Sequence, residues 1–235
     1  GPPVLTRTEN LVSYHADLGR LLMVGRVPDI VAQCLGEPVF LYKEKINWKS
    51  PGGAGYAAHQ DAPAFPMLDT ERAATVLISI DAATEANGCL EFAAGRHREG
   101  MIGLTADGII GQEAQAGLAK DWVKCPTEPG DVVVFSCHVP HRSGPNASGG
   151  GRALLYLTYN AQATGYLRDE YYRRKRMAFA ASAAGSPDAE RAAGSISLIN
   201  HFQGRVVDSG DLGVTRQVER LRALFAEKGA TMYDP

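Results

Sequence analysis

The chain has 235 residues, of which 45% are hydrophobic and 21% are charged, which suits one well-buried globular domain. Its formal net charge of -2 lacks the basic excess of a nucleic-acid binder, and no apolar run approaches the ~18 residues that span a bilayer. We therefore expect a single domain over residues 1–235, as a monomer or homodimer, that acts on a small-molecule substrate and has no nucleic-acid or membrane partner.

The four cysteines lie far apart and form no C-x-x-C pair, so neither a zinc knuckle nor a redox pair is indicated. The first residues, Gly1-Pro2-Pro3, have no charged segment followed by an apolar one, as a secretory signal would, although a natural N-terminal segment could have been trimmed. These features favour a reducing, cytoplasmic location.

Taken in chain order, the pattern begins with N-terminal helices over residues 1–37. Apolar residues recur at helical spacing from Leu18 to Leu35, and Gly36 provides a stop. From Pro38 to Asn160 the chain consists of short β-rich runs separated by Gly, Pro and Asn, which is typical of a strand sandwich or barrel. The expected strands are Val39–Trp48, Tyr56–Asp61, Ala74–Ala82, Cys89–Ala93, Trp122–Cys125, Asp131–Ser136 and Arg152–Asn160.

Three connecting segments in this β-rich region have distinct patterns. Asn87-Gly88 predicts a tight turn, and the glycine-rich stretch Ser143–Gly151 predicts a hairpin loop. Residues 98–120 form an expected insertion that folds over a pocket. Residues 161–235 are expected to be helical, with a charged run at Arg168–Arg176 and a terminal helix over 214–228.

The first chemically informative motif is His59-Gln60-Asp61. Side chains two apart on a strand point to the same face, with α-carbons roughly 6.6 Å apart, so one metal ion can bridge the imidazole and the carboxylate. Taken alone, the motif fits a surface histidine beside a turn aspartate better than a metal site, because H-x-D arises easily by chance. A third ligand is available from His141, or from its neighbour His138, after the apolar run Val132–Phe135.

Two histidines and one carboxylate on one face of a metal leave other positions open, which is the arrangement of non-haem iron oxygenases. Arg152 begins the next strand, and a guanidinium there is suited to holding a terminal carboxylate. His, Asp, His and Arg on successive β elements are much less expected by chance than any one of them. His141 is preferred over His138 because only His141 has Ser two positions later and Arg eleven positions later.

At this point the sequence resembles the phytanoyl-CoA dioxygenase-like family of iron(II)/2-oxoglutarate oxygenases, which includes ectoine hydroxylases. The resemblance runs from about Val39 to Asn160 and rests on several motifs. These are Asn47-Trp48-Lys49, Pro51-Gly52-Gly53, His59-Gln60-Asp61, Asn87-Gly88-Cys89-Leu90, Gly95-Arg96-His97, Pro129-Gly130-Asp131 and His141-Arg142-Ser143 with Arg152.

The resemblance implies roles for several residues. His59, Asp61 and His141 would ligate Fe(II), while Arg152 and Ser143 would grip the distal carboxylate of 2-oxoglutarate. Asn47 and Tyr56 match positions that touch this co-substrate in relatives, although the loop between them is a residue short.

Other residues are candidates for contact with the substrate. Lys43 and Lys45 alternate with Asn47, so they either line the barrel interior, where they would favour an anionic substrate, or lie solvated at an open end. Tyr156 shares a face with Arg152, and Arg96 stands where the family commonly has serine.

We therefore expect a mainly β fold, a double-stranded β-helix (a cupin-like jelly roll) with flanking α-helices. The implied activity is that of a dioxygenase that uses Fe(II), 2-oxoglutarate and O2, releases succinate and carbon dioxide, and hydroxylates a small polar or anionic metabolite or a natural-product intermediate. Oxidative cyclisation or desaturation by the same chemistry remains an alternative. So does a non-catalytic jelly-roll protein that binds or senses a metal.

Overall fold

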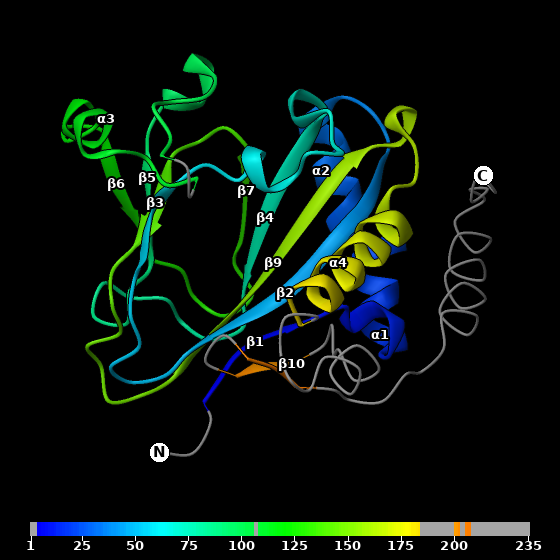
Figure 1. Ribbon diagram of the computed structural model, residues 1–235, viewed down its shortest axis with the longest axis horizontal. Coiled ribbons are helices and arrows are strands. Elements are labelled where there is room, and N and C mark those ends of the chain that lie inside the picture. Colours follow the sequence, from blue (N-terminus) through cyan, green and yellow to red (C-terminus); the bar gives the residue numbers. More distant parts are fainter. Residues whose placement is uncertain (1–3, 106–107, 184–199, 203–204, 208–235) are drawn as a thin grey trace. The chain divides into compact units, whose positions relative to one another are not determined.

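A computed structural model describes residues 4–105, 108–183, 200–202 and 205–207 (Figure 1). The chain divides into two compact units, one formed by residues 1–46 and 157–235 and the other by residues 47–156. Two long strands, β2 (Val39–Lys49) and β9 (Arg152–Ala161), contribute residues to both units. The single domain expected over residues 1–235 therefore remains a prediction.

The first unit begins with a strand that the sequence did not predict. β1 (Leu5–Glu9) pairs antiparallel with β10 (Asn200–Phe202), which pairs with β11 (Arg205–Val207), and the strand order continues through β2 to β9. Only three to five residues form each of these additional strands, too few for hydrophobic alternation to identify them.

The helices of this unit follow the predicted pattern with one interruption. α1 (Ala16–Gly19) runs into a π-helical turn, Arg20–Val24, and α2 (Arg26–Leu35) ends at Gly36 in the left-handed conformation, as predicted. The two helical segments are separated at Gly25, where the backbone leaves the helical conformation and a β-carbon would lie 2.9 Å from the Leu21 carbonyl oxygen, so glycine is favoured there. No helix among the described residues is long and apolar enough to cross a membrane.

The predicted charged helix is α4 (Arg168–Ala183), which packs on β2 (Figure 1). Its first residue, Arg168, is fully buried and forms a two-bond ion pair with Glu44. The helix predicted over residues 214–228 lies outside the described residues.

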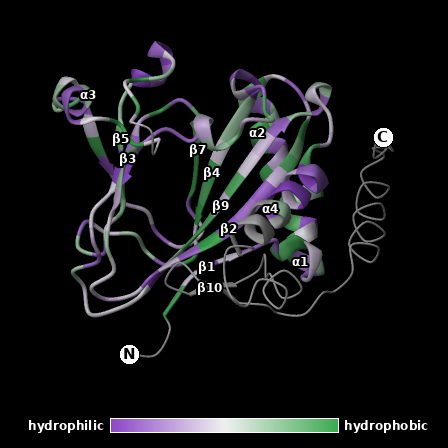
Figure 2. Cartoon of the chain, viewed as in Figure 1, coloured by the Kyte–Doolittle hydropathy of each residue, from purple (hydrophilic) through white to green (hydrophobic). Residues whose placement is uncertain are grey.

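The second unit consists of two facing antiparallel sheets. In the first, β9 is followed in order by β4 (Ala73–Ser79) and β7 (Val132–Ser136). The second has the order β3 (Tyr56–His59), β8 (His141–Ser143), β5 (Leu90–Ala93) and β6 (Trp122–Cys125). Hydrophobic residues predominate along β4 (Figure 2), and a core cluster joins Leu77 and Leu154 of one sheet to Leu90 of the other. This is the layered, mainly β arrangement that the strand pattern predicted.

The loop over Ser143–Gly151 is not the hairpin that was predicted. β8 and β9 belong to different sheets, so the loop crosses from one sheet to the other. Asn146 closes this loop by donating from Nδ2 to the carbonyl oxygens of Lys49, at 2.9 Å, and Gly150, at 2.8 Å. A glycine-rich stretch between two strands signals a reversal of direction, but it carries no information on which sheet the second strand joins.

The expected insertion over residues 98–120 packs along β3. It contains α3 (Gln112–Gly117), and the Ile110 amide donates to the Ala58 carbonyl at 2.8 Å. Ile110 and Leu118 are buried against Ala58 and Ala93. The segment therefore supports β3, the strand that carries His59. That it folds over a pocket remains a prediction.

Candidate functional site

His59, Asp61 and His141 come together in the second unit. Cα pairing sets His59, the last residue of β3, opposite His141, the first residue of β8. The Oδ1 atom of Asp61 lies 4.0 Å from His59 Nε2 and 3.9 Å from His141 Nε2, and one donor atom from each residue lies within 4.8 Å of the others. A divalent metal with bonds of about 2.1 Å bridges donors separated by up to ~4.2 Å, and both distances from Asp61 fall within this limit, so the cluster is a candidate metal centre.

The backbone geometry that produces this cluster differs from the extended strand expected over Tyr56–Asp61. Tyr56 pairs with Ser143 and His59 with His141, so two residues of β3 oppose one of β8 in a β-bulge. The strand ends at His59, and Asp61, with φ −75 and ψ −28, precedes the 3₁₀ turn Ala62–Ala64. A bulge and a turn, rather than simple alternation, therefore bring the carboxylate to the two imidazoles.

Hydrogen bonds orient all three candidate ligands. His59 Nδ1 donates to the Ala57 carbonyl at 2.8 Å and His141 Nδ1 to the Val139 carbonyl at 3.1 Å. Because a carbonyl only accepts, each ring carries its proton on Nδ1 and leaves the Nε2 lone pair for a metal. The hydroxyl of Thr75 donates to Asp61 Oδ2 at 2.7 Å, and the sequence gave no indication of this contact.

Gln60, which lies between His59 and Asp61 in the sequence, is also held by hydrogen bonds. Gln60 is 2% exposed, and its Nε2 donates to the carbonyls of Gly100, at 2.7 Å, and His138, at 2.5 Å. Its Oε1 accepts from the Ile102 amide at 2.9 Å. Gln60 thus connects the His59–Asp61 turn to the segment over residues 98–120 and to the start of the His138–His141 loop.

His138, the rejected alternative ligand, faces elsewhere. Its Nε2 lies 3.2 Å from the Thr70 hydroxyl and 3.8 Å from a Glu71 carboxylate oxygen. Among the described residues, the cluster able to hold a metal contains His141 and not His138.

A second group of polar side chains gathers around Arg152, at the start of β9. Arg152 is 3% exposed, its Nη2 donates to the Gly88 carbonyl at 2.5 Å, and its Nε is buried without a hydrogen-bond partner. Lys49, also buried, donates from Nζ to Ser143 Oγ at 2.9 Å and to the Gly144 carbonyl at 2.7 Å. We call Lys49, Ser143 and Arg152 the cationic clamp.

The clamp carries two positive charges without an acidic partner. Burial and, to a smaller extent, the positive charge of Arg152 lower the pKa of Lys49 to about 8, against an opposing effect of Cys89. Among the residues that the structure describes, neither Lys49 nor Arg152 forms an ion pair. Because unpaired buried charge is costly, this arrangement is suited to an anionic ligand such as the carboxylate of a 2-oxo acid.

The clamp depends on a close approach of the backbone at Gly88. This residue has φ +78, and a β-carbon there would lie 2.3 Å from the Gly144 carbonyl oxygen and 2.9 Å from Lys49 Nζ. The Asn87-Gly88 pair therefore provides the predicted turn and also leaves room for Lys49 beside Arg152.

Lys49 is a second site residue, after Thr75, that sequence reasoning missed. Lys49 belongs to the Asn47-Trp48-Lys49 motif and lies two residues after Asn47. On a strand these two side chains share a face, and this was the signal that could have identified Lys49. Asn47 is itself 6% exposed, and its Oδ1 is buried without a hydrogen-bond partner. Tyr56 is 42% exposed, its amide donates to Ser143 Oγ at 3.3 Å, and its ring centre lies 5.6 Å from Lys49 Nζ.

The remaining predicted residues lie in varied surroundings. Burial raises the pKa of Tyr156, and the neighbouring charge of Arg152 opposes that effect, which places this hydroxyl beside the clamp. Arg96 instead pairs with Asp121, at 2.8 Å, and Glu99, at 2.5 Å.

The two lysines expected as substrate contacts belong to the first unit. Lys43 lies 5.7 Å from the ring centre of Tyr171, and both Lys43 and Lys45 are half-buried. Their contact with a substrate remains a prediction.

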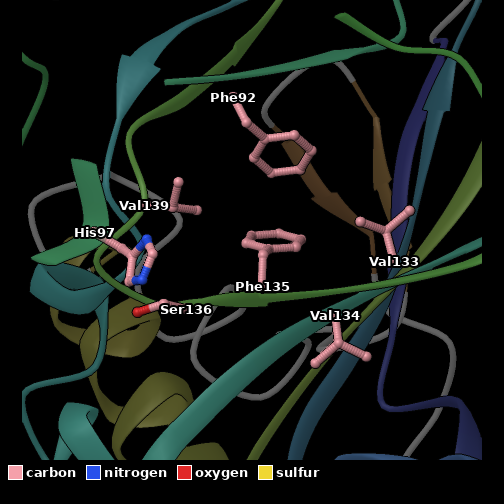
Figure 3. A pocket seen from close by; sticks show the side chains of 7 residues that line it. All are labelled: Phe92, His97, Val133, Val134, Phe135, Ser136 and Val139. Carbon is pink, nitrogen blue, oxygen red and sulfur yellow. The ribbon is translucent and has the colours of Figure 1, made fainter. Parts of the chain in front are cut away.

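A mainly apolar pocket of about 400 Å³ is lined in part by Phe92 and Phe135, and both of these residues lie near His141. Phe92 is the Cα partner of His141, and the Phe135 ring centre lies 5.3 Å from that of His141. Figure 3 shows the rings of Phe92 and Phe135 between His97 at one end and Val133 at the other. A small ligand held here would contact mostly hydrocarbon surface beside a candidate metal ligand.

Comparisons with known proteins show the family to which the chain belongs. The family model of phytanoyl-CoA dioxygenase (PhyH) matches residues 6–154. The chain is 46% identical to a methylphosphonate hydroxylase of Gimesia maris over 85% of this chain and 74% of that protein. It is 39% identical to a 2-aminoethylphosphonate dioxygenase of an uncultured bacterium, HF130_AEPn_1, over 83% of this chain and 71% of that protein.

Among solved structures, EctD from S. alaskensis with 2-oxoglutarate and 5-hydroxyectoine superimposes with a TM-score of 0.60 at 24% identity. The match covers 68% of this chain and 58% of that one, and it confirms the predicted jelly-roll fold. The family model and the two relatives confirm the predicted family. The chain belongs to the phytanoyl-CoA dioxygenase (PhyH) family and is an iron(II)/2-oxoglutarate-dependent dioxygenase.

Proposed function

We propose that this dioxygenase hydroxylates a carbon atom of a small phosphonate and converts 2-oxoglutarate to succinate and carbon dioxide. The observation that carries the proposal is the presence, in one compact unit, of a His–Asp–His cluster and a buried cationic clamp without an acidic partner. A protein that only binds a metal has no use for the clamp.

The residues of the cluster fit iron(II). Two imidazole nitrogens and one carboxylate oxygen form the ligand set of non-haem iron oxygenases, and both histidine protons are already held on the far nitrogens. In the proposal, His59, Asp61 and His141 hold the metal, which when bound supplies the oxidative chemistry with 2-oxoglutarate and O2.

The clamp fits the distal carboxylate of 2-oxoglutarate. The unpartnered Nε of Arg152 and the ammonium of Lys49 are the donors that an acceptor-only carboxylate needs, and Ser143 lies between β3 and the Lys49 side chain. In the proposal, Lys49 and Arg152 neutralise this carboxylate and fix the orientation of the co-substrate, so that its 2-oxo end faces the metal.

The substrate class is supported by the relatives and by the cavity. Both reported relatives are named for phosphonates with one or two carbon atoms. A pocket of about 400 Å³ with a mainly apolar lining that includes Phe92, Phe135 and Val133 favours a short alkyl group.

The experiment has two stages. Iron(II) and 2-oxoglutarate are added without oxygen, and the visible charge-transfer band is recorded. Oxygen is then admitted with methylphosphonate, 2-aminoethylphosphonate, or their carboxylate counterparts acetate and 3-aminopropanoate. We expect the band, and succinate formation coupled to hydroxylation of a phosphonate but not of the matched carboxylates.

The other outcomes identify the alternatives. Coupled turnover of the carboxylates alone would overturn the substrate class, and a product that has lost two hydrogens without gaining oxygen would indicate desaturation or cyclisation. If neither the charge-transfer band nor succinate forms, the result favours the alternative of a protein that only binds a metal. The Asp61→Ala variant is the control, and it is expected to abolish succinate formation.

A further inference from the structure

The two carboxylate oxygens of Asp61 have different surroundings. Oδ1 faces both histidines, at 4.0 and 3.9 Å from their Nε2 atoms, whereas Oδ2 accepts a 2.7 Å hydrogen bond from the Thr75 hydroxyl. Thr75 lies on β4, in the sheet opposite to that of the two histidines. A metal among the three candidate ligands would therefore meet one oxygen of Asp61, while the other is held from the facing sheet.

The direction of this hydrogen bond follows from its partners. An ionised carboxylate only accepts, so the single hydroxyl proton of Thr75 points to Asp61. Cys137 Sγ lies 3.9 Å from Thr75 Oγ1, and because that oxygen has already used its proton, the thiol is the donor in this contact. Thr75 is 3% exposed and Cys137 is 0% exposed, so water does not compete for this chain of hydrogen bonds.

Backbone pairing keeps Thr75 in this place. β4 and β7 pair without a register shift from Ala74–Ser136 to Ile78–Val132, which sets Thr75 opposite Phe135. The Ala62 amide donates to the Cys137 carbonyl at 3.0 Å, so the turn after Asp61 is attached to the residue that contacts Thr75.

We propose that Thr75 is a positioning residue that keeps Asp61 bound to the metal through Oδ1 alone. If Asp61 turned to bind through both oxygens, the buried Thr75 hydroxyl would lose its acceptor, and one coordination position needed by 2-oxoglutarate or O2 would be filled. The proposal rests on the proposed function, since it assumes that the cluster holds iron(II).

The test compares Thr75→Val, which removes the hydroxyl at nearly constant volume, with Thr75→Ser, which retains it. Thr127→Val is the matched control, because Thr127 is also buried and its hydroxyl lies 2.6 Å from that of Ser79, away from the candidate ligands. Each variant is saturated with iron(II) without oxygen and titrated with 2-oxoglutarate, and the charge-transfer band is recorded. This readout does not require turnover.

For Thr75→Val we expect 2-oxoglutarate to bind about 10- to 100-fold more weakly, with a shifted or weakened band, as for the loss of other groups that orient metal ligands. Thr75→Ser and Thr127→Val are expected to match the unaltered protein. A band of unchanged position and intensity in Thr75→Val at saturating iron(II) would overturn the proposal. If that variant does not fold, Thr75→Ala, which introduces no larger group, is tested against the same criterion. Failure of the unaltered protein to give any band would instead overturn the proposed function.

Discussion

Two buried arginines, one in each compact unit, differ in how their charge is balanced. Arg168 pairs through Nη1 and Nη2 with both carboxylate oxygens of Glu44, and its Nη2 also bonds Asn10. Arg152 has one carbonyl partner and lies beside a second cation, Lys49. Both leave Nε without a hydrogen-bond partner, but only Arg168 has a carboxylate that balances its charge. A buried cation with its own carboxylate has its charge balanced within the fold, whereas one without a carboxylate is available to a ligand.

Replacing Arg168 should have the largest effect on stability. Arg168→Met leaves the fully buried Glu44 carboxylate without its partner, and breaking a buried pair in this way costs roughly 3–5 kcal/mol. We expect the free energy of unfolding, measured by urea denaturation, to fall by about that amount. The double variant Glu44→Leu/Arg168→Met should recover most of it, since no charge is then left alone. Equal destabilisation by the single and double variants would contradict this account.

Arg152→Met should have the opposite profile, with a large loss of binding and little loss of stability. Truncating one partner of a buried charge-assisted contact costs roughly 2–5 kcal/mol, about 30-fold or more in the Kd for 2-oxoglutarate. Because Arg152 has no acidic partner among the described residues, we expect the melting temperature to stay the same or rise. A destabilisation as large as that of Arg168→Met, with 2-oxoglutarate affinity unchanged, would show that Arg152 is structural.

The pH dependence of 2-oxoglutarate binding should show whether Lys49 contributes its charge to the clamp. Burial lowers the pKa of Lys49 to about 8, so the free protein loses this charge near pH 8, while a bound carboxylate favours the charged form. Binding then takes up a proton, and the Kd for 2-oxoglutarate should rise up to about tenfold per pH unit above pH 8 and stay level below pH 7.

Calorimetric titration with a redox-inert divalent metal measures this dependence between pH 6.5 and 9.5. Lys49→Arg should bind with little dependence on pH, because a guanidinium stays charged throughout this range. Lys49→Met should bind more weakly at low pH and also lose the dependence. If the Kd of the unaltered protein for 2-oxoglutarate does not change with pH, Lys49 does not take part in binding it.

Most of the fold was accessible from the sequence because its strands are long enough for hydrophobic patterns and its turns carry strong signals. The predicted strand over Trp122–Cys125 is observed as predicted, and those ending at Ala93 and Ser136 differ only in their first residue. β8 has three residues and was missed as a strand, although its first residue was the chosen histidine. Local patterns also cannot show which sheet a strand joins, which is why the hairpin after Ser143 was wrong.

The candidate site was only partly accessible for a related reason. Motif spacing pointed to His59, Asp61 and His141, and these three do converge. The environment of Lys49 depends on the backbone of Gly88 and Gly144, which are far away in sequence, and in the sequence Thr75 is simply a β-branched residue of a strand. Contacts between opposite sheets have no local signature, so they emerge only from the folded chain.

The smallest expected effect distinguishes the two histidines of the His138–His141 loop. His138→Ala removes contacts with Thr70 and Glu71, at 3.2 and 3.8 Å, and leaves the carbonyl that accepts from Gln60 in place, because that group belongs to the backbone. Its succinate formation should therefore stay within about twofold of the unaltered protein, since neither the metal nor the clamp is touched. His141→Ala, assayed in parallel for bound iron and succinate, should lose both. If His138→Ala lost iron instead, His138 rather than His141 would be the metal ligand of this loop. The hydrogen bond from His141 Nδ1 to the Val139 carbonyl would then have a purely structural role.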